Sequence, residues 1–321
     1  MRTIIILIML TIVITGCRGI NGENQPEIPY ENNLEPIVLF CPDEGCGKNL
    51  EFLLNSAKSS IECAFFDLDL KNIINTLADK SSEVEVKVVI DNINYENQLM
   101  GNVKTDNSSR LMHNKFCIID DKVVWTGSFN PTENGDKKNN NNVIVLYSML
   151  IAENFNDEFE ELWNGEFSRG DKVDNPIISL NNKKIETYFC PEDNCEEQVR
   201  KQIRNAKKSI YFMTFSFTSE GIGDEILFTE NIDIKGVFEA RGAGKFSQFE
   251  RLKGFGINVK KDKNKANMHH KVFIIDNETV ITGSYNPTAN GNKNNDENLM
   301  IIHDKKIAGK YLEEFNKVFY Q

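Results

Sequence analysis

The apolar and polar positions along this chain predict strands that alternate with helices, in the same order twice over. Short apolar or alternating runs predict strands at 38–40, 61–66, 84–90, 116–119, 123–125, 143–147 and 299–302. Apolar residues at helical spacing predict helices at 49–58, 152–163 and 308–320. Alternating strands and helices are typical of an α/β fold, in which helices cover both faces of a sheet.

The order recurs because the second part of the chain repeats the first. Phe40-Cys41-Pro42 matches Phe189-Cys190-Pro191 at an offset of 149 residues. From Met112 onward, 18 of 31 residues equal their counterparts at a constant offset of 156. A net insertion of seven residues is therefore expected between Ile210 and Met268. A repeat of this length predicts two similar halves.

Repeat and composition together divide the chain into five segments. The stretches 18–36 and 164–186 are polar and contain Gly and Pro, which is typical of a tether and a linker. We expect a signal peptide at 1–16, a tether at 17–36, a first half at 37–165, a linker at 166–186 and a second half at 187–321. Two domains of roughly 150 residues fit a chain of this length.

The N-terminal segment is typical of a bacterial lipoprotein signal. Arg2 precedes an apolar run at 4–14, and the small residue Gly16 stands directly before Cys17. The run is short for a membrane span and suits an export signal. We expect cleavage before Cys17 and a lipid on its thiol, which would hold an exported protein at a membrane surface. A plain signal peptide with a chance Cys is the alternative.

The other six cysteines form two classes. Two pairs share one spacing, and they are Cys41 with Cys46 and Cys190 with Cys195. In an exported protein they predict one local disulfide per half, and a zinc site built from all four thiolates is the alternative. Cys63 and Cys117 lie in apolar strands and are expected to be buried, inert thiols.

Composition and charge narrow the partners. The chain is 40% hydrophobic and 26% charged, with a formal net charge of −11. An acidic protein argues against a broad basic face for duplex DNA. A local cluster of Lys260, Lys261, Lys263 and Lys265 could still line a cleft, although a solvated loop is the simpler interpretation.

One pattern within the repeat is suited to chemistry on a phosphate. Its two copies are His113, Lys115, Asp120, Gly127, Ser128 and Asn130, and His269, Lys271, Asp276, Gly283, Ser284 and Asn286. Residues two apart on a strand share a face, so each His and Lys project together, and a hairpin brings Gly-Ser-x-Asn back beside them. Lys and Asn can hold phosphoryl oxygens, Gly lets backbone N–H groups approach a phosphate, and imidazole can attack phosphorus or transfer a proton.

Two such copies facing each other would surround a single phosphate. In-line displacement needs a nucleophile on one side of phosphorus and an acid at the leaving oxygen on the other. Two imidazoles related by a twofold axis supply both groups. The lysines would neutralise the equatorial oxygens, so this chemistry requires no metal and no cofactor.

The doubled pattern resembles the phospholipase D superfamily over nearly all of residues 37–321. The resemblance implies two halves, each a mixed sheet flanked by helices, packed with pseudo-twofold symmetry. It also implies a covalent phosphohistidine on His113, with His269 as general acid and then general base. The residues that would grip the phosphate are Lys115, Lys271, Asn130 and Asn286, supported by Ser128 and Ser284. Asp120 and Asp276 complete the catalytic motif and are expected to fix local structure.

Members of this superfamily also carry an acidic or amide residue after each Gly-Ser-x-Asn, which orients the His of the other half. Here the second half supplies Glu297, and the matching place in the Asn run at 139–142 is Asn141. A carboxylate on His113 would raise its basicity and fix its tautomer, as suits a nucleophile, whereas an amide only orients His269. A partly degraded first half in a slow enzyme is the alternative.

The remaining histidines are not expected to act in catalysis. His270 would point to the opposite strand face from His269 and pack there, and His303 ends a strand and is expected at the surface. With so few histidines within reach, no His-based metal site is expected.

The sequence thus predicts a membrane-tethered phosphodiesterase that hydrolyses a phospholipid to phosphatidate and an alcohol. The first alternative is an extracytoplasmic, metal-independent nuclease, because the same chemistry cuts DNA. The second is a lipoprotein that only binds phosphate groups. The expected partners are a phospholipid or nucleic-acid substrate and the membrane, with the protein as a monomer.

Overall fold

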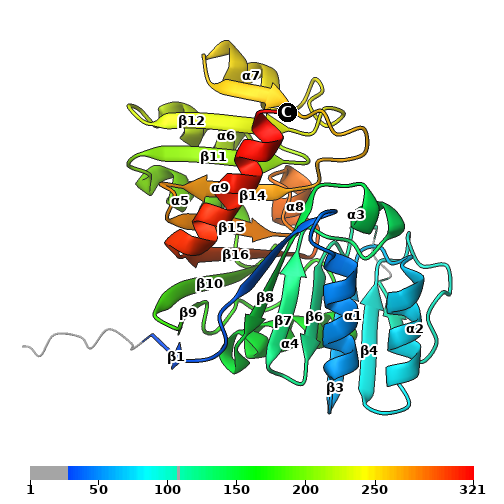
Figure 1. The fold of residues 1–321 in the computed structure, drawn as a ribbon. Coiled ribbons are helices and arrows are strands. Elements are labelled where there is room, and N and C mark those ends of the chain that lie inside the picture. The colour runs from blue at the N-terminus through cyan, green and yellow to red at the C-terminus, as the bar shows by residue number, and fades with distance from the viewer. Residues whose placement is uncertain (1–27, 107–108) are drawn as a thin grey trace, which may run out of the picture.

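The computed structural model describes residues 28–106 and 109–321 (Figure 1). The expected signal peptide at 1–16, Cys17 and the first part of the expected tether lie outside these residues. Within the described ranges, no helix combines the length and the apolar character that crossing a bilayer requires.

The first half is built on a mixed sheet. Along this sheet the strands are β2 (Ile37–Cys41), β8 (Asn141–Tyr147), β7 (Val123–Gly127), β6 (Lys115–Ile119), β3 (Ser60–Phe65), β4 (Glu85–Ile90) and β5 (Asn102–Thr105). β3, β4 and β5 are parallel, and the other pairs are antiparallel. The helices are α1 (Cys46–Ser56), α2 (Lys71–Lys80), the short α3 (Glu133–Lys137) and α4 (Met149–Trp163).

The second half repeats this order strand for strand. The corresponding strands are β10 (Lys183–Cys190), β16 (Glu297–His303), β15 (Thr279–Gly283), β14 (Lys271–Ile275), β11 (Ser209–Thr214), β12 (Asp233–Phe238) and β13 (Asn258–Lys261). Its helices are α5 (Cys195–Asn205), α6 (Glu220–Phe228), α7 (Phe249–Gly254), the short α8 (Ala289–Lys293) and α9 (Lys305–Phe319). The predicted α/β fold of two similar halves is confirmed.

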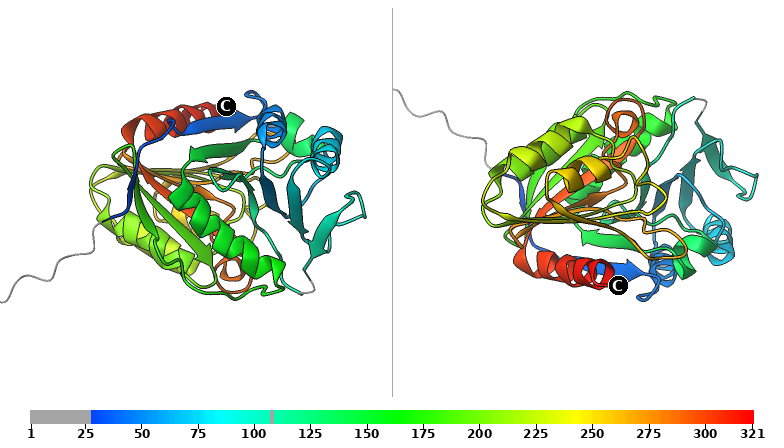
Figure 2. Two further views of the ribbon diagram at one scale, coloured as in Figure 1. Left: turned by 90° about the horizontal axis from the view of Figure 1, so that it is seen from below. Right: turned by 90° about the horizontal axis from the view of Figure 1, so that it is seen from above.

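The two sheets pack against each other through a shared hydrophobic core. This core takes residues from both sheets and from α4 and α9, whereas a separate core lies under α1 and α2 and another under α5, α6 and α7. α4 and α9 lie on opposite sides of the paired sheets (Figure 2). In α9 the buried residues include Ile307, Tyr311, Phe315 and Val318, which recur at helical spacing and form the apolar stripe that faces this core.

The seven-residue insertion coincides with α7. The first half passes from β4 to β5 through residues 91–101, and the second passes from β12 to β13 through residues 239–257, which contain this helix. The insertion therefore changes a connection and leaves the strand order unchanged.

Two segments that were expected to be flexible contain strands. β1 (Tyr30–Glu31) lies in the expected tether and pairs in parallel with β9 (Ile177–Leu180), which lies in the expected linker at 166–186. The Glu31 carboxylate accepts hydrogen bonds from the Met149 N–H and the Ser148 hydroxyl at the start of α4. The expected linker at 166–186 therefore includes a strand of the second sheet, and Ile178 and Leu180 of this strand are buried in the shared core.

The cysteines form three disulfides in the described residues. Cys41–Cys46 and Cys190–Cys195 form the local disulfides that were predicted, one in each half. Each bridge joins the end of a strand to the start of a helix. The expectation of free thiols at Cys63 and Cys117 was wrong. These residues stand directly opposite each other in the β3–β6 pair, with Cα atoms 4.1 Å apart, and form the third disulfide.

Candidate active site

Each motif histidine is held by a residue of the other half. His113 Nδ1 lies 2.7 Å from Glu297 Oε2, and His269 Nδ1 lies 2.8 Å from Asn141 Oδ1. These are the two partners that the sequence predicts. The backbone crosses in the same way, because the His113 N–H donates to the Asp296 carbonyl and the His269 N–H donates to the Asn140 carbonyl. Both imidazoles therefore lie at the boundary between the halves.

The partners also assign the tautomers. His269 Nδ1 is 3.0 Å from the Ser128 carbonyl oxygen as well as close to the Asn141 amide oxygen, and both oxygens can only accept. His113 Nδ1 faces the Glu297 carboxylate and the Ser284 backbone. Each Nδ1 is therefore the protonated nitrogen, and each Nε2 is left for a substrate.

Lys115 and Lys271 are buried beside these histidines. The Lys115 ammonium donates to the His113 carbonyl at 2.6 Å, and the Lys271 ammonium donates to the His269 carbonyl at 2.9 Å. The two ammonium groups repel each other, and both lower the pKa values of the two histidines. The structure thus brings two buried cations and two imidazoles together, as expected for a site that receives an anion.

Burial controls the charges in this site. Burial lowers the pKa of Lys115 to about 7, and it lowers the pKa of Lys271 well below its usual range. Burial, together with the two ammonium groups, also holds the pKa of His113 well below its usual value. Burial raises the pKa of Glu297 to about 8, against the opposing effect of Lys115 and of the Ser284 hydroxyl. A bound phosphodiester anion would favour the charged forms of both lysines.

Two phenylalanines complete the walls of the site, and the sequence analysis missed them. The Phe66 ring packs edge-on against the His113 ring at 4.8 Å, and the Phe215 ring packs against the His269 ring at 4.6 Å. Each phenylalanine ring also lies 4.9 Å from the lysine ammonium of its own half. A signal was present, because the two residues are equivalent in the repeat and directly follow the strands β3 and β11.

The motif serines contact the residues that orient the histidines. The Ser284 hydroxyl donates to Glu297 Oε2 at 2.6 Å, and the Ser128 hydroxyl contacts the side-chain oxygens of Asn142 at 3.2 Å and Asn141 at 3.4 Å. The expectation that these serines support the grip on the phosphate stays a prediction, and the contacts give them a role in positioning as well. They fix the groups that in turn fix the histidines.

Asn130 and Asn286 follow the serines at the boundary of the halves. Their Oδ1 atoms are buried and accept no hydrogen bond from other described residues. Buried polar groups without protein partners are uncommon and often belong to functional sites. The expected grip on a phosphate stays a prediction, and it would use the Nδ2 donors, because phosphate oxygens and amide oxygens both only accept.

The motif glycines are required where two strands approach closely. Gly127 and Gly283 have φ angles of 147° and 136°, and a Cβ there would lie 2.2 Å from the Asn142 carbonyl oxygen and 2.4 Å from that of Asn298. Their missing side chains let the strand containing each orienting residue approach closely. The glycines therefore allow the close approach of the strands that carry the orienting residues.

Asp120 and Asp276 act at the far ends of the motif hairpins. The Asp120 carboxylate accepts hydrogen bonds from the backbone N–H groups of residues 58–60, and Asp276 does the same for residues 207–209. Both residues have positive φ angles in two-residue turns. They complete the sequence motif, but they contact neither the histidines nor the lysines, so the structure gives them a local role only.

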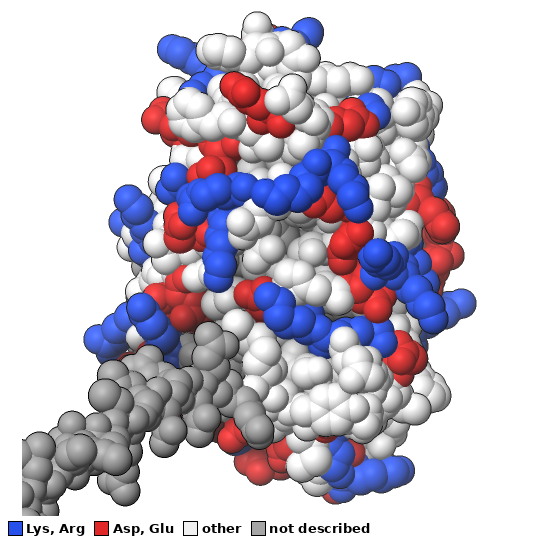
Figure 3. Space-filling view, turned by 90° about the vertical axis from the view of Figure 1, so that its left-hand side faces the viewer, with Lys and Arg blue, Asp and Glu red and all other residues white. Residues whose placement is uncertain are grey.

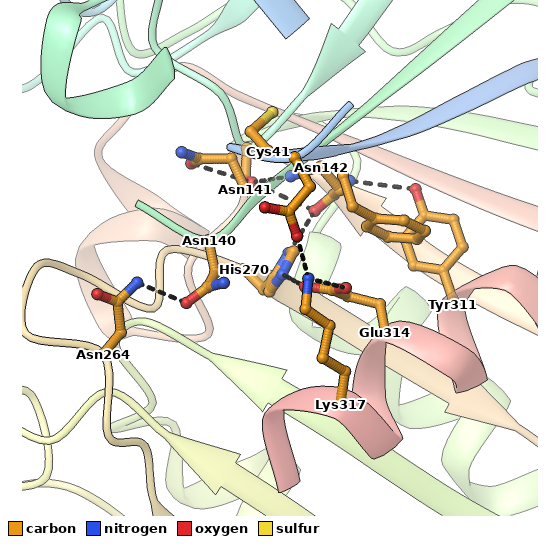
Figure 4. A network of polar contacts seen from close by, with 12 residues as sticks. Cys41, Asn140, Asn141, Asn142, Asn264, His270, Tyr311, Glu314 and Lys317 are labelled. Atoms are coloured by element: carbon orange, nitrogen blue, oxygen red, sulfur yellow. Dashed lines mark hydrogen bonds and ion pairs between the residues drawn. The ribbon is translucent and has the colours of Figure 1, made fainter. Parts of the chain in front are cut away.

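His270 and His303 lie outside the candidate site. His270 is fully buried and contacts Asn142 and Glu314, in a network that runs on to Tyr311 and Lys317 (Figure 4). The expected packed role of His270 agrees with this position. His303 ends β16 and is partly exposed, as expected, and it also pairs with Glu186 at 2.7 Å. Nothing in the sequence indicated that the buried Glu186 carboxylate would be the partner of His303.

The arrangement defines a phosphodiesterase-type site shared by two halves, and comparison with known proteins gives the family. Residues 50–163 and 199–319 match the family described as cardiolipin synthase, PLD-like domain. The chain therefore belongs to the phospholipase D superfamily, with both halves contributing.

Individual relatives agree with this assignment. Phospholipase D of Rickettsia conorii is 34% identical over 151 residues, which are 43% of this chain and 71% of that protein. Mitochondrial cardiolipin hydrolase of Xenopus laevis is 28% identical over 150 residues, which are 45% of this chain and 70% of that protein. The crystal structure of phosphatidylserine synthase from Haemophilus influenzae shares the fold, with a TM-score of 0.69 and 12% identity, over 88% of this chain and 86% of that one. The chain is a phosphoric diester hydrolase of the phospholipase D type.

Proposed function

We propose that this protein hydrolyses a phospholipid to phosphatidate and an alcohol, through a covalent phosphohistidine on His113. The observation that carries the proposal is the crossed pair of contacts, His113 to Glu297 and His269 to Asn141. Each contact leaves one Nε2 for chemistry, and only His113 has a carboxylate to stabilise the positive charge that develops on a nucleophilic imidazole.

The first step forms the intermediate. Nε2 of His113 bonds to phosphorus while the bond from phosphorus to the alcohol oxygen breaks, and the departing oxygen takes a proton from Nε2 of His269. Lys115 and Lys271 stabilise the charge on the non-bridging oxygens. Burial and the positive charges of both lysines lower the pKa of His269 in the empty site, and a bound anion would oppose this effect, which favours the protonated imidazole that the leaving oxygen needs.

The second step regenerates the enzyme. Water loses a proton to Nε2 of His269 as its oxygen bonds to phosphorus, and the bond between phosphorus and His113 breaks. Phosphatidate leaves, and His269 again carries the proton needed for the next cycle. Phe66 and Phe215 cover one side of each imidazole, which limits the access of other water molecules.

A nuclease is the alternative, and the lysines after β12 are the feature that favours it. Their positions weaken this alternative. The Lys260 ammonium donates to the Phe319 carbonyl at 3.1 Å, Lys263 donates to the carbonyl of Gln321, and Lys261 donates to the Ala243 carbonyl. On the face in Figure 3, basic and acidic side chains are interspersed. Lys260, Lys261 and Lys263 therefore contact residues 319–321 and a neighbouring loop, which supports the interpretation of a solvated loop over a groove for a polyanion.

We also propose that the protein is exported and anchored through Cys17. Support comes from the sequence before Cys17 and from the three disulfides, which are typical of oxidising compartments. Labelling of cells with a radioactive fatty acid tests this proposal. Label in the wild-type protein and not in a Cys17→Ser variant is expected, and equal label in both would contradict it.

A substrate comparison tests the proposed function. Purified protein lacking the N-terminal 27 residues is incubated with vesicles of phosphatidylcholine, vesicles of cardiolipin, and single-stranded DNA. Phosphatidate should form from at least one lipid, and His113→Ala should reduce the rate at least about 1,000-fold. Cleavage of DNA with no turnover of either lipid would reject the phospholipase proposal in favour of the nuclease.

A further inference from the structure

A pocket of about 420 Å³ opens beside the candidate active site, on the side of the second half. Asn286 of the motif lines it, and so does Leu111, two residues before His113. Asn295 also lines it, and its amide nitrogen lies 3.4 Å from Glu297 Oε1. A volume of this size is typical of small-molecule sites, and the lining places the pocket next to a phosphate held by the motif.

The lining of this pocket is uncharged and mixes polar and apolar surface. Besides the three residues above, it consists of Ser216, Thr218, Thr288, Ala289 and Asn290. Ser216 and Thr218 directly follow Phe215, and both are half-buried. No hydrogen bond within residues 28–106 and 109–321 uses either hydroxyl, whereas the Thr288 hydroxyl is occupied by the Gly291 N–H. The pocket thus presents two hydroxyls that can donate to and accept from a ligand.

The first half has acidic residues at the equivalent places. Ser216, Thr218 and Ala289 correspond in the repeat to Asp67, Asp69 and Glu133. The backbone confirms the correspondence, because the Asp69 N–H donates to the Pro131 carbonyl as the Thr218 N–H donates to that of Pro287. The two sides of the site therefore differ in charge, although their backbones match. A neutral group with hydroxyls is better suited to the second-half side than a charged one.

We propose that this pocket binds an uncharged, hydroxyl-bearing group that is esterified to the scissile phosphate, such as glycerol. The inference rests on the proposed phosphodiesterase site. Ser216 and Thr218 provide the hydrogen bonds, and Leu111 packs against the carbon atoms of the group. A glycerol ester of a lipid and a sugar ester of a nucleotide share this chemistry, so the experiment includes both sources.

Competition against a chromogenic diester tests the proposal. The substrate is bis(4-nitrophenyl) phosphate, and the competitors are glycerophosphoglycerol and di-n-propyl phosphate, which have the same carbon number and differ in hydroxyls. The inhibition constant of glycerophosphoglycerol should be about 10-fold lower, as expected for one or two net hydrogen bonds. In the double variant Ser216→Ala/Thr218→Val the difference should fall below about 3-fold.

Two controls keep the outcomes separate. Thr218→Ser keeps a hydroxyl and should preserve most of the preference, and di-n-propyl phosphate is the internal reference for folding and for phosphate binding. Equal inhibition by both diesters in the wild type, or an equal loss of both in the double variant, would overturn the proposal. If the wild type does not hydrolyse the chromogenic diester, the proposed function fails, and calorimetric titration of the same two diesters still tests the pocket.

The source of the group follows from a second pair of competitors. Phosphatidylglycerol in detergent micelles and the dinucleotide thymidylyl-thymidine each contain a single phosphodiester with hydroxyl groups. Stronger inhibition by the lipid, with sensitivity to Ser216→Ala/Thr218→Val, supports a glycerol group. The same sensitivity for the dinucleotide alone assigns the pocket to a sugar. Sensitivity for neither would overturn the proposal.

Discussion

Glu297 and Asn141 occupy equivalent places in the two halves and differ in charge, and this difference distinguishes the two histidines. The Glu297 carboxylate can stabilise an imidazolium on His113, whereas the Asn141 amide only holds the His269 ring in place. The sequence alone gave both partners through the alignment of the repeat. It could not show that Ser128 and Ser284 hold these partners, because that contact depends on how closely the strands approach.

Exchange of the orienting groups tests this asymmetry. Glu297→Gln should lower kcat for bis(4-nitrophenyl) phosphate at least about 100-fold, because an amide can present its NH2 group to Nδ1 and select the wrong tautomer. Asn141→Asp keeps an acceptor at His269 and should cost less than about 10-fold. A larger loss in Asn141→Asp than in Glu297→Gln would contradict the assignment of His113 as the nucleophile.

The charge of Lys115 predicts how binding depends on pH. Burial lowers the pKa of Lys115 to about 7, so the ammonium is present below this pH and is lost above it. The inhibition constant of dimethyl phosphate, which does not titrate in this range, should therefore rise as the pH increases from 6 to 8.5. A guanidinium stays protonated, so Lys115→Arg should weaken this dependence and leave only the part that comes from Lys271 and Glu297. A constant affinity in the wild type would show that Lys115 remains charged.

At the scale of the elements, hydrophobic patterning predicted most strands and the long helices, with ends that differ by a few residues. The patterning did not predict the short strands β1 and β9, because their few residues carry no clear alternation of apolar and polar positions and pair only with distant parts of the chain. The Cys63–Cys117 bridge was missed for the same reason, because strand register cannot be read from a single strand. The short helix α7 appeared in the sequence only as a change of offset.

The cross-strand disulfide should contribute to stability. Cys63 and Cys117 are 54 residues apart, and a bridge that closes such a loop typically stabilises a fold by about 2–4 kcal/mol. Replacement of both by Ala should lower the free energy of unfolding in urea by about that amount. The matched control is the double variant Cys41→Ala/Cys46→Ala, which opens a loop of only five residues and should cost less. Equal losses, or none for Cys63 and Cys117, would contradict the expected effect.

At the scale of the whole molecule, buried polar contacts link the two halves in a symmetric way. Asn298 donates to Asn114 at 2.9 Å, and Asn114 donates to Glu158, while in the other direction Asn142 contacts His270, which pairs with Glu314. The two networks are equivalent in the repeat except that His270 takes the place of an Asn. The sequence predicted that His270 is packed, but that it pairs with Glu314 on α9 could be seen only in the structure.

This symmetry predicts which substitutions in the polar contacts between the two halves leave the free energy of unfolding nearly unchanged. His270→Asn recreates the arrangement of the first half and should change the free energy of unfolding by less than about 1 kcal/mol. Glu314→Leu leaves the buried His270 without its carboxylate and should cost about 1–3 kcal/mol. Urea denaturation measures both, and a greater loss for His270→Asn than for Glu314→Leu would show that the networks are not equivalent.

The joint active site of the two halves is tested most directly by locating the covalent intermediate. His269→Ala is mixed with bis(4-nitrophenyl) phosphate, whose leaving group needs little protonation, and the quenched protein is digested and analysed by mass spectrometry. The predicted result is a 4-nitrophenylphosphoryl group on a ring nitrogen of His113, formed with loss of one 4-nitrophenolate and absent from the double variant His113→Ala/His269→Ala. Modification of another residue, or wild-type rates of turnover in His113→Ala, would contradict a site in which the two halves share one phosphate.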